Sequence, residues 1–263
     1  MKKNSKKTQI AYTNILGVRI SRLSKAEAIA WIERWVSEGG QKMIVTPNPE
    51  QVMMAQKDGY FRQILYGADL ALADGGGLVW AGRVLQSKVK SQKSTVLDER
   101  ITGEKMMQEL TRMAAKHGWK VFLLGGKPGV AEKAAEDLRF KIYDLRIRTS
   151  SGVKDIQHET EEERRRVIGE INRFRPDLLF VAYGAPWQEK WLARNLKYLD
   201  VKVGMVVGGA LDMIVDPSLR PPKWMTNAGF DWLYRLLRQP WRIKRQMMLV
   251  SFVVAVLRRR FMA

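Results

Sequence analysis

Short apolar runs alternate with amphipathic or charged segments along most of this 263-residue chain. The apolar runs have the length of buried strands, each is followed by a turn with glycine or proline, and they cover residues 43–45, 70–73, 119–124, 178–183 and 201–207. Helical spacing or charge marks the segments between them, such as residues 25–37 and 161–174. The alternation predicts an α/β fold with a Rossmann-like, mostly parallel sheet and helices on both faces.

Local signals predict where two of the helices begin. Ser24 and Glu27 have the spacing of a capping box, so we expect a helix over about residues 25–37. Asn48 is a candidate N-cap, because proline follows at the first helical position and Gln51 is placed to bond back. Such a helix start also presents free backbone amides to an anion, so Asn48 can cap the helix and bind a ligand.

Three segments carry weaker signals. Residues 15–20 are expected to form one short strand, and residues 86–95 a polar, lysine-rich surface loop. Residues 141–160 resist assignment.

Asp74 stands where a buried run ends in three glycines. In an open parallel sheet, ligands bind in the crevice beyond the carboxyl ends of the strands, and we expect the Asp74 carboxylate to point into it. Asp74 is therefore the leading candidate for a catalytic base. The alternative is a turn aspartate that caps the next helix, since Asp-Gly is a common turn pair, and this segment alone does not decide between them.

The charge of the chain indicates the kind of partner. Lys and Arg number 46 against 27 Asp and Glu, and the net charge of +19 indicates nucleic acid, an anionic membrane or a phosphate-bearing substrate. There is no cysteine, which excludes disulfides, thiolate nucleophiles and cysteine zinc sites. The basic residues at the start are not followed by the apolar core of a signal peptide, so we expect a protein that is not exported.

The composition changes near residue 220. Ten Lys or Arg residues but only one acid, Asp231, lie between there and the end, with tryptophan and tyrosine between them. We therefore divide the chain into a basic tail (1–14), an α/β catalytic core (15–219) and a basic helical appendage (220–263).

An apolar run of eleven residues, 247–257, lies within this appendage. As a helix it would reach only about half of a roughly 30 Å hydrocarbon core, so it cannot span a membrane alone. Three arginines follow it, which favours a helix lying in the membrane interface. The alternative is a terminal helix that packs on the core.

The sequence lacks the residues that several kinds of chemistry require. The two histidines, His117 and His158, have no partner at metal-ligand spacing, and there is no Asp-x-Asp pair. The glycine turn at residues 125–129 lacks the spacing and the Ser/Thr of a Walker loop. No metal and no cofactor is therefore expected. If the protein handles a nucleotide-diphosphate leaving group, arginines must supply the compensating charge, and the appendage has them.

Six motifs occur in a definite order. They are TPNPE at 46–50, DG at 74–75, ERITG at 99–103, GAPWQEKW at 184–191, GGALD at 208–212 and the segment from DWLYR at 231–235 to residue 245. Together they resemble the WecG/TagA/CpsF family of bacterial glycosyltransferases, glycosyltransferase family 26. The resemblance runs from about residue 15 to the end of the chain.

The resemblance implies an inverting, metal-independent enzyme. Such enzymes move a sugar, often N-acetylmannosamine, from a UDP-sugar donor to a polyprenyl-diphosphate-linked sugar acceptor in teichoic-acid or other cell-surface polysaccharide synthesis. We therefore expect a cytoplasmic protein, peripheral on the inner face of the cell membrane, whose appendage meets the anionic membrane surface, and no nucleic acid partner. The donor sugar, the acceptor lipid, the polymer and the choice between monomer and homo-oligomer stay open.

The resemblance also implies roles for individual residues. Asp74 matches the proposed base and is taken as catalytic together with Thr46. The positions expected to bind substrate are Asn48, Arg100, Gln188, Gly208, Gly209 and Asp212. The arginines expected to close over the UDP diphosphate are Arg235, Arg242 and Arg245. This agrees with the chemistry, because an inverting transfer needs a carboxylate to take the acceptor proton and cations aimed at the departing UDP.

The chain departs from the family pattern at Glu104-Lys105, at Trp187 and at residues 216–218. None of these touches Asp74 or the arginines of the appendage. The departures therefore concern the sugar and the acceptor rather than the class of reaction.

Two other classes of protein are kept as alternatives. A nucleotide-dependent oxidoreductase is supported only by the glycine turn at residues 125–129, and its acidic ribose-binding residue has only a weak candidate in Asp144. A non-catalytic basic protein that binds nucleotides, nucleic acid or a membrane is the other. A nucleic-acid binder should spread its charge along a groove, whereas here the charge lies beside an apolar run.

Overall fold

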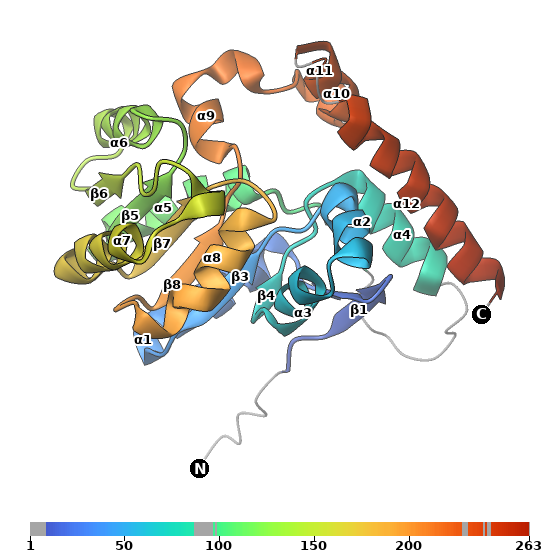
Figure 1. The fold of residues 1–263 in the computed structure, drawn as a ribbon, viewed down its shortest axis with the longest axis horizontal. Helices are drawn as coiled ribbons and strands as arrows, with labels where there is room; N and C mark the ends of the chain where they lie inside the picture. The colour runs from blue at the N-terminus through green and yellow to red at the C-terminus, as the bar shows by residue number, and fades with distance from the viewer. Residues whose placement is uncertain are drawn as a thin grey trace.

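The computed structural model describes residues 9–86, 97, 99–227, 231–238, 240 and 243–262. Within them, six strands form one sheet in the order β4-β3-β8-β7-β5-β6, and all of its pairings are parallel (Figure 1). The strands are β3 (Lys42–Val45), β4 (Leu70–Ala71), β5 (Lys120–Gly125), β6 (Arg146–Ser150), β7 (Leu178–Ala182) and β8 (Val203–Val206). The expected α/β fold with a mostly parallel sheet is confirmed.

Successive residues of a strand point to opposite sides of the sheet, and here both sides are apolar. Helices therefore cover both faces of the sheet. In β7, Phe180 packs into one apolar layer and Val181 into the other. The layer around Phe180 receives α1 (Lys25–Glu38), α5 (Gly103–His117), α6 (Val130–Lys141) and α9 (Ala210–Val215). The layer around Val181 receives α2 (Pro49–Lys57), α3 (Gly59–Gly67), α4 (Gly76–Gln86), α7 (Glu161–Phe174), α8 (Trp187–Asn195) and α12 (Ile243–Met262).

The predicted helix starts are confirmed. Ser24 and Glu27 form a reciprocal capping box at α1. Asn48 and Gln51 form a second one at α2, with Pro49 at the first helical position. These caps rest on contacts three residues apart, so the sequence alone carries the signal.

The amino-terminal strand prediction is wrong in its count. Instead of one strand over residues 15–20, an antiparallel hairpin forms from β1 (Tyr12–Ile15) and β2 (Val18–Ser21). Its two-residue turn places Leu16 at φ 49° and Gly17 at φ 82°. Hairpin turns with two positive φ angles usually contain Asn-Gly or Asp-Gly. This turn contains Leu-Gly, so its sequence did not indicate a hairpin.

The unassigned residues 141–160 hold β6 and a short 3-10 helix, Ile156–His158. β6 lies at the edge of the sheet and pairs with β5. In its sequence RIRTS only Ile147 and Ser150 are buried. An edge strand has so few apolar residues that the run-length pattern cannot reveal it. A surface loop is expected at residues 86–95. Gln86 is the last residue of α4, and residues 87–95 lie outside the described residues.

The carboxyl-terminal segment, residues 220–262, contains α10 (Lys223–Asn227), α11 (Asp231–Arg238) and α12. Figure 1 shows α12 lying along α2 and α4, where Phe252 and Val256 are fully buried. One face of α12 therefore packs on the core, as the alternative expects, and the attachment of its other face to a membrane stays a prediction. The division of the chain at residue 220 stays a prediction, but this last helix shares the core of the α/β body. Within the described ranges, no helix combines the length and the apolar character that a membrane crossing requires.

Candidate active site

Four neighbouring strands bring the sequence motifs to one edge of the sheet. The order β4-β3-β8-β7 places their carboxyl ends side by side, since all pairings are parallel. The residues that follow these strands are Asp74, then Thr46 and Asn48, then Gly208 and Gly209, and then Gln188. We call Thr46, Asn48, Asp74, Gln188 and Gly208 the strand-end cluster. Open α/β sheets bind their ligands at this edge, beyond the carboxyl ends of the strands.

Asp74 lies in the turn between β4 and α4. Its backbone N–H donates to the Pro47 carbonyl over 2.9 Å, which ties this turn to the one after β3. The start of α4 also packs on that turn: a Cβ at Gly77 would come within 2.7 Å of the Pro49 ring, so a larger residue would force the two apart. About a quarter of the Asp74 side chain is exposed, at 27%. A carboxylate fixed in this way and still open to solvent can meet a substrate.

Arg100 connects Asp74 to the carboxyl-terminal segment. Its Nη2 lies 4.0 Å from Asp74 Oδ1, and its Nη1 donates to Asp231 Oδ2 over 2.5 Å. Asp231 begins α11 and also accepts from the Thr226 hydroxyl over 3.1 Å. The predicted pocket position Arg100 is therefore shared between two carboxylates, one from the sheet edge and one from the segment.

A second ion pair joins the same two parts of the chain. Arg220 Nε donates to Glu104 Oε1 over 2.7 Å, near the start of α5. The sequence predicts a departure from the family pattern at Glu104. In the structure this side chain helps to hold the carboxyl-terminal segment.

Thr46 is buried beneath the start of α5. Its hydroxyl donates to the Val206 carbonyl over 3.3 Å, and a Cβ at Gly103 would lie 3.1 Å from its Oγ1. The side chain is 6% exposed. Thr46 therefore joins the ends of β3 and β8 and fixes the approach of the loop that carries Arg100.

Asn48 caps α2 as expected. Its Oδ1 accepts from the Gln51 N–H over 2.9 Å, and its own N–H donates to Gln51 Oε1 over 3.0 Å. Gln51 in turn donates from Nε2 to Glu189 Oε1 over 3.0 Å. The cap is therefore linked to α8, the helix that follows β7.

Gln188 reaches the same acceptor from the other side. Its Nε2 donates to Glu189 Oε1 over 3.0 Å, and its Oε1 accepts from the Gly208 N–H over 3.0 Å. Gln188 is 2% exposed, and Gly208 adopts a positive φ of 55°. The side chain predicted to bind substrate is thus tied to the turn after β8.

Glu189 is a buried carboxyl group that the sequence reading did not single out. The side chain is fully buried, and no hydrogen-bond partner among the described residues reaches its Oε2. Burial raises the pKa of Glu189 to about 7, against smaller lowering effects of the hydrogen bonds from Gln188, its own backbone and Gln51. An acidic residue in the first turn of a helix is ordinarily explained by the helix dipole, so the sequence held no sign of its burial.

Gly209 and Asp212 belong to the start of α9. Gly209 precedes the helix at φ −82°, and the Asp212 carbonyl accepts from the Asp216 N–H over 2.8 Å. Both positions follow directly from the turn at Gly208. Both lie at the same sheet edge, and their role in substrate binding stays a prediction.

The three predicted diphosphate arginines are described only in part. Arg235 lies in α11 and Arg245 in α12, where the structure places the backbone alone. Arg242 lies outside the described residues. Their role stays a prediction from the sequence.

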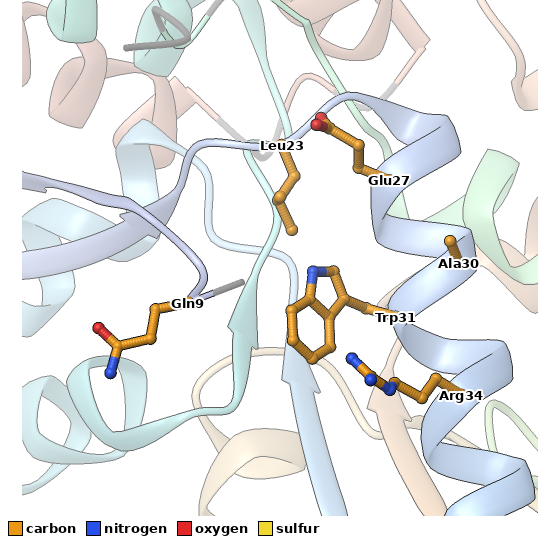
Figure 2. Close-up of a pocket in the computed structure, with 6 residues that line it drawn as sticks. All are labelled: Gln9, Leu23, Glu27, Ala30, Trp31 and Arg34. Carbon is orange, nitrogen blue, oxygen red and sulfur yellow. The ribbon is translucent and has the colours of Figure 1, made fainter. Parts of the chain in front are cut away.

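A shallow hollow of about 270 Å³ lies elsewhere, beside α1 (Figure 2). Trp31 and Arg34 line it together with Gln9, Leu23, Glu27 and Ala30. None of the predicted site residues borders it. Among the described residues, no three His, Cys, Asp or Glu side chains gather closely enough to hold a metal ion.

Comparison with known proteins gives one consistent result. A sequence model of the glycosyl transferase WecG/TagA/CpsF family matches residues 13–263. An N-acetylglucosaminyldiphosphoundecaprenol N-acetyl-beta-D-mannosaminyltransferase of Bacillus subtilis (strain 168) is 31% identical over 217 residues, which make up 82% of this chain and 79% of the relative. A protein of the same name from Staphylococcus aureus (strain MRSA252) is 30% identical over 241 residues, 91% of this chain and 89% of the relative.

Proposed function

This chain belongs to the WecG/TagA/CpsF family of glycosyl transferases, and from this premise we propose which sugar transfer it performs. The family resemblance in the sequence is confirmed, and the chain is a hexosyltransferase. The proposed reaction moves N-acetylmannosamine or a related hexose from a UDP-sugar to a polyprenyl-diphosphate-linked N-acetylglucosamine. The names of the two relatives, which cover most of this chain, support this choice of donor sugar and acceptor. The product would serve teichoic-acid or other cell-surface polysaccharide synthesis.

The observation that carries the proposal is the Asp74 carboxylate at the sheet edge, with the Arg100 guanidinium 4.0 Å away. In the proposed step, the acceptor hydroxyl oxygen attacks the anomeric carbon while the bond to the UDP oxygen breaks. Asp74 takes the hydroxyl proton, and UDP departs with the bonding electron pair. Attack on the face opposite the leaving group inverts the anomeric centre. A positioned base of this kind typically contributes about 10²–10⁴-fold to the rate.

The remaining charge to be balanced is that of the departing UDP. We assign this to Arg235, Arg242 and Arg245, whose planar guanidinium groups suit bidentate contacts with a diphosphate. The substrate positions Asn48, Arg100, Gln188, Gly208, Gly209 and Asp212, with Thr46 beside them, belong to loops and helix starts at the same sheet edge. No metal ion and no cofactor takes part in this scheme.

The outward side of α12 supports a peripheral attachment to the membrane. Its exposed apolar residues recur three and four positions apart, on one face of the helix: Met247, Val250, Val254, Leu257 and Phe261. Two exposed arginines, Arg258 and Arg259, lie in the helical turn between Leu257 and Phe261. An apolar stripe beside cations is typical of a helix that rests on an anionic lipid surface. We propose that the enzyme meets its lipid-linked acceptor there, on the cytoplasmic side.

The test is UDP release from a panel of UDP-sugars, each with and without polyprenyl-diphosphate-linked N-acetylglucosamine in lipid vesicles. We expect release that depends on the acceptor with UDP-N-acetylmannosamine or a related hexose donor, and mass spectrometry of the lipid product should show one added sugar. No acceptor-dependent release from any donor, with folded protein and vesicles present, would refute the proposed reaction.

A further inference from the structure

Glu189 occupies the point where the turns after β3 and β8 are joined. Two glutamines reach its Oε1 from opposite sides, Gln51 from α2 and Gln188 from the start of its own helix, each over 3.0 Å. Each glutamine uses its remaining oxygen in the same way, to accept one backbone N–H. Gln51 accepts from Asn48, in the turn after β3, and Gln188 accepts from Gly208, in the turn after β8, both over 3.0 Å.

A single carboxylate oxygen of Glu189 thus links the turn that carries Asn48 to the turn that carries Gly208. The path from the Asn48 turn to the Gly208 turn runs through four hydrogen bonds and one acceptor atom. If that acceptor is lost, both glutamines are free to rotate, and the two turns lose this connection, although the Thr46–Val206 hydrogen bond between the ends of β3 and β8 remains. A misplacement of about 1 Å at a catalytic site can lower the rate by about 10²-fold.

Burying the Glu189 carboxyl group costs folding free energy, which indicates that its placement serves function rather than stability. The Glu189 side chain is fully buried, and its Oε2 has no hydrogen-bond partner in the part of the chain that the structure describes. A buried carboxyl group with an unpartnered oxygen opposes folding. Local arrangements that oppose stability tend to occur at functional sites, where geometry is the constraint.

Glu189 does not suit the role of a base. Its side chain has no exposed surface, and its Oε1 already accepts two amide hydrogens. It has no open face to an acceptor hydroxyl, in contrast to the partly exposed Asp74. Any effect on the reaction must therefore pass through the two glutamines.

We propose that Glu189 is a positioning residue of the sugar transfer, which holds Asn48 and Gln188 in register through its shared carboxylate oxygen. The proposal rests on the function proposed above. Its consequence is that an acceptor atom is needed at this place, whereas the negative charge is not.

The experiment compares Glu189→Gln with Glu189→Met. The glutamine variant keeps an oxygen acceptor in the same place, so we expect kcat/KM within about threefold of wild type. The methionine variant keeps the length and loses the acceptor, so we expect kcat/KM to fall by about 10- to 100-fold. Hydrogen exchange of peptides covering residues 46–52 and 204–210 should quicken in Glu189→Met alone, a readout that does not depend on transfer.

A matched control separates positioning from general destabilisation. Leu192 lies on the same helix, is fully buried and packs against Gly204 without bonding to either turn. Leu192→Ala should lower the melting temperature, yet keep kcat/KM near wild type when assayed well below that temperature. Equal losses of kcat/KM in Leu192→Ala and Glu189→Met would overturn the proposal, because a merely structural role predicts them.

Two further outcomes are decisive. Unchanged exchange at both turns in a folded Glu189→Met overturns the proposal whether or not transfer is detected, so a failure of the proposed reaction remains distinguishable. Should Glu189→Met not fold, Glu189→Asp replaces it, because the shorter side chain withdraws the oxygen from both glutamines. A fall in kcat/KM with Glu189→Asp and its retention with Glu189→Gln would support the proposal, and the reverse would overturn it.

Discussion

The strand-end cluster and the carboxyl-terminal segment are held by different kinds of contact. The cluster lies on the ends of paired parallel strands, where buried polar groups bond from turn to turn, as Thr46 does with Val206. The segment meets the same edge through the ion pairs of Arg100 with Asp231 and of Glu104 with Arg220. Farther on, it is anchored by apolar burial in α12.

The two regions carry different parts of the proposed reaction. The base, Asp74, sits on the rigid sheet edge, whereas the arginines assigned to the leaving group sit on the separately attached segment. Proton transfer should therefore tolerate little change in the hydrogen bonds of the cluster. Stabilisation of the leaving group should depend on how the segment is attached.

The anchor of α12 gives the largest expected effect. Phe252 is fully buried between α12 and the helices α2 and α4, so Phe252→Ala should lower the free energy of unfolding by about 3–5 kcal/mol. Val253 is the control, because it lies on the same helix and is 37% exposed. Val253→Ala should change the free energy of unfolding by less than about 1 kcal/mol. Urea unfolding measures both. Equal effects of the two substitutions would show that α12 does not share the core.

The buried carboxyl group of the cluster gives the next effect, a dependence of stability on pH. The pKa of Glu189 rises from 4.5 in the unfolded chain to about 7 in the fold, because burial disfavours the charged form. The folded protein therefore holds this proton more tightly, and the stabilisation present below pH 4.5 is lost as the pH rises through about 7. By linkage, this amounts to about 3 kcal/mol.

Glu189→Gln cannot titrate, so it isolates this contribution. The unfolding free energy of wild type minus that of Glu189→Gln should fall by about 3 kcal/mol between pH 4 and pH 9. Charged groups nearby, such as the ion pair of Asp58 with Lys190, are the same in both proteins and cancel. A difference that stays constant over this range would mean that folding leaves the pKa of Glu189 at its value in the unfolded chain.

The ion pair between the two regions gives a smaller effect on activity. Asp231→Asn removes the charge that holds Arg100, which is 22% exposed, and we expect kcat/KM to fall by about tenfold, or 1.4 kcal/mol. The control is Asp200→Asn, which breaks an exposed pair with Arg175 and should leave kcat/KM unchanged. Wild-type kinetics of Asp231→Asn would show that this contact does not place the segment for catalysis.

The outward side of α12 gives the smallest effect. Val254→Asp should weaken binding to anionic vesicles by about fivefold, or about 1 kcal/mol, and leave the melting temperature unchanged, because the side chain is 44% exposed. Phe140 is more exposed, at 92%, but lies on α6, so Phe140→Asp should bind vesicles like wild type. Co-sedimentation with vesicles measures both, and equal binding of the two variants would remove α12 from the membrane contact.

The sequence predicted what local signals encode. The buried strands, the caps at Ser24 and Asn48 and the placement of Asp74 after a strand all depend on neighbours a few residues away. The common sheet edge followed from the alternation of strands and helices. The motifs could therefore be gathered at one edge before their contacts were known.

Contacts between distant residues were beyond such signals. Arg100 and Asp231 are 131 residues apart, and Gln51 and Glu189 are 138 apart, so no spacing rule relates them. The burial of Glu189 depends on three elements that meet only in the fold. The same holds for α12, whose apolar run predicted one buried or membrane-facing side but not that its two sides differ.

The central claim is that Asp74 is the base, and the most direct measurement compares wild type with Asp74→Asn for both kcat and the Kd of UDP. The asparagine keeps the shape of the turn but cannot take the acceptor proton. We expect kcat to fall by about 10²–10⁴-fold while the Kd of UDP stays within about twofold. A folded Asp74→Asn enzyme with the kcat of wild type would contradict the account.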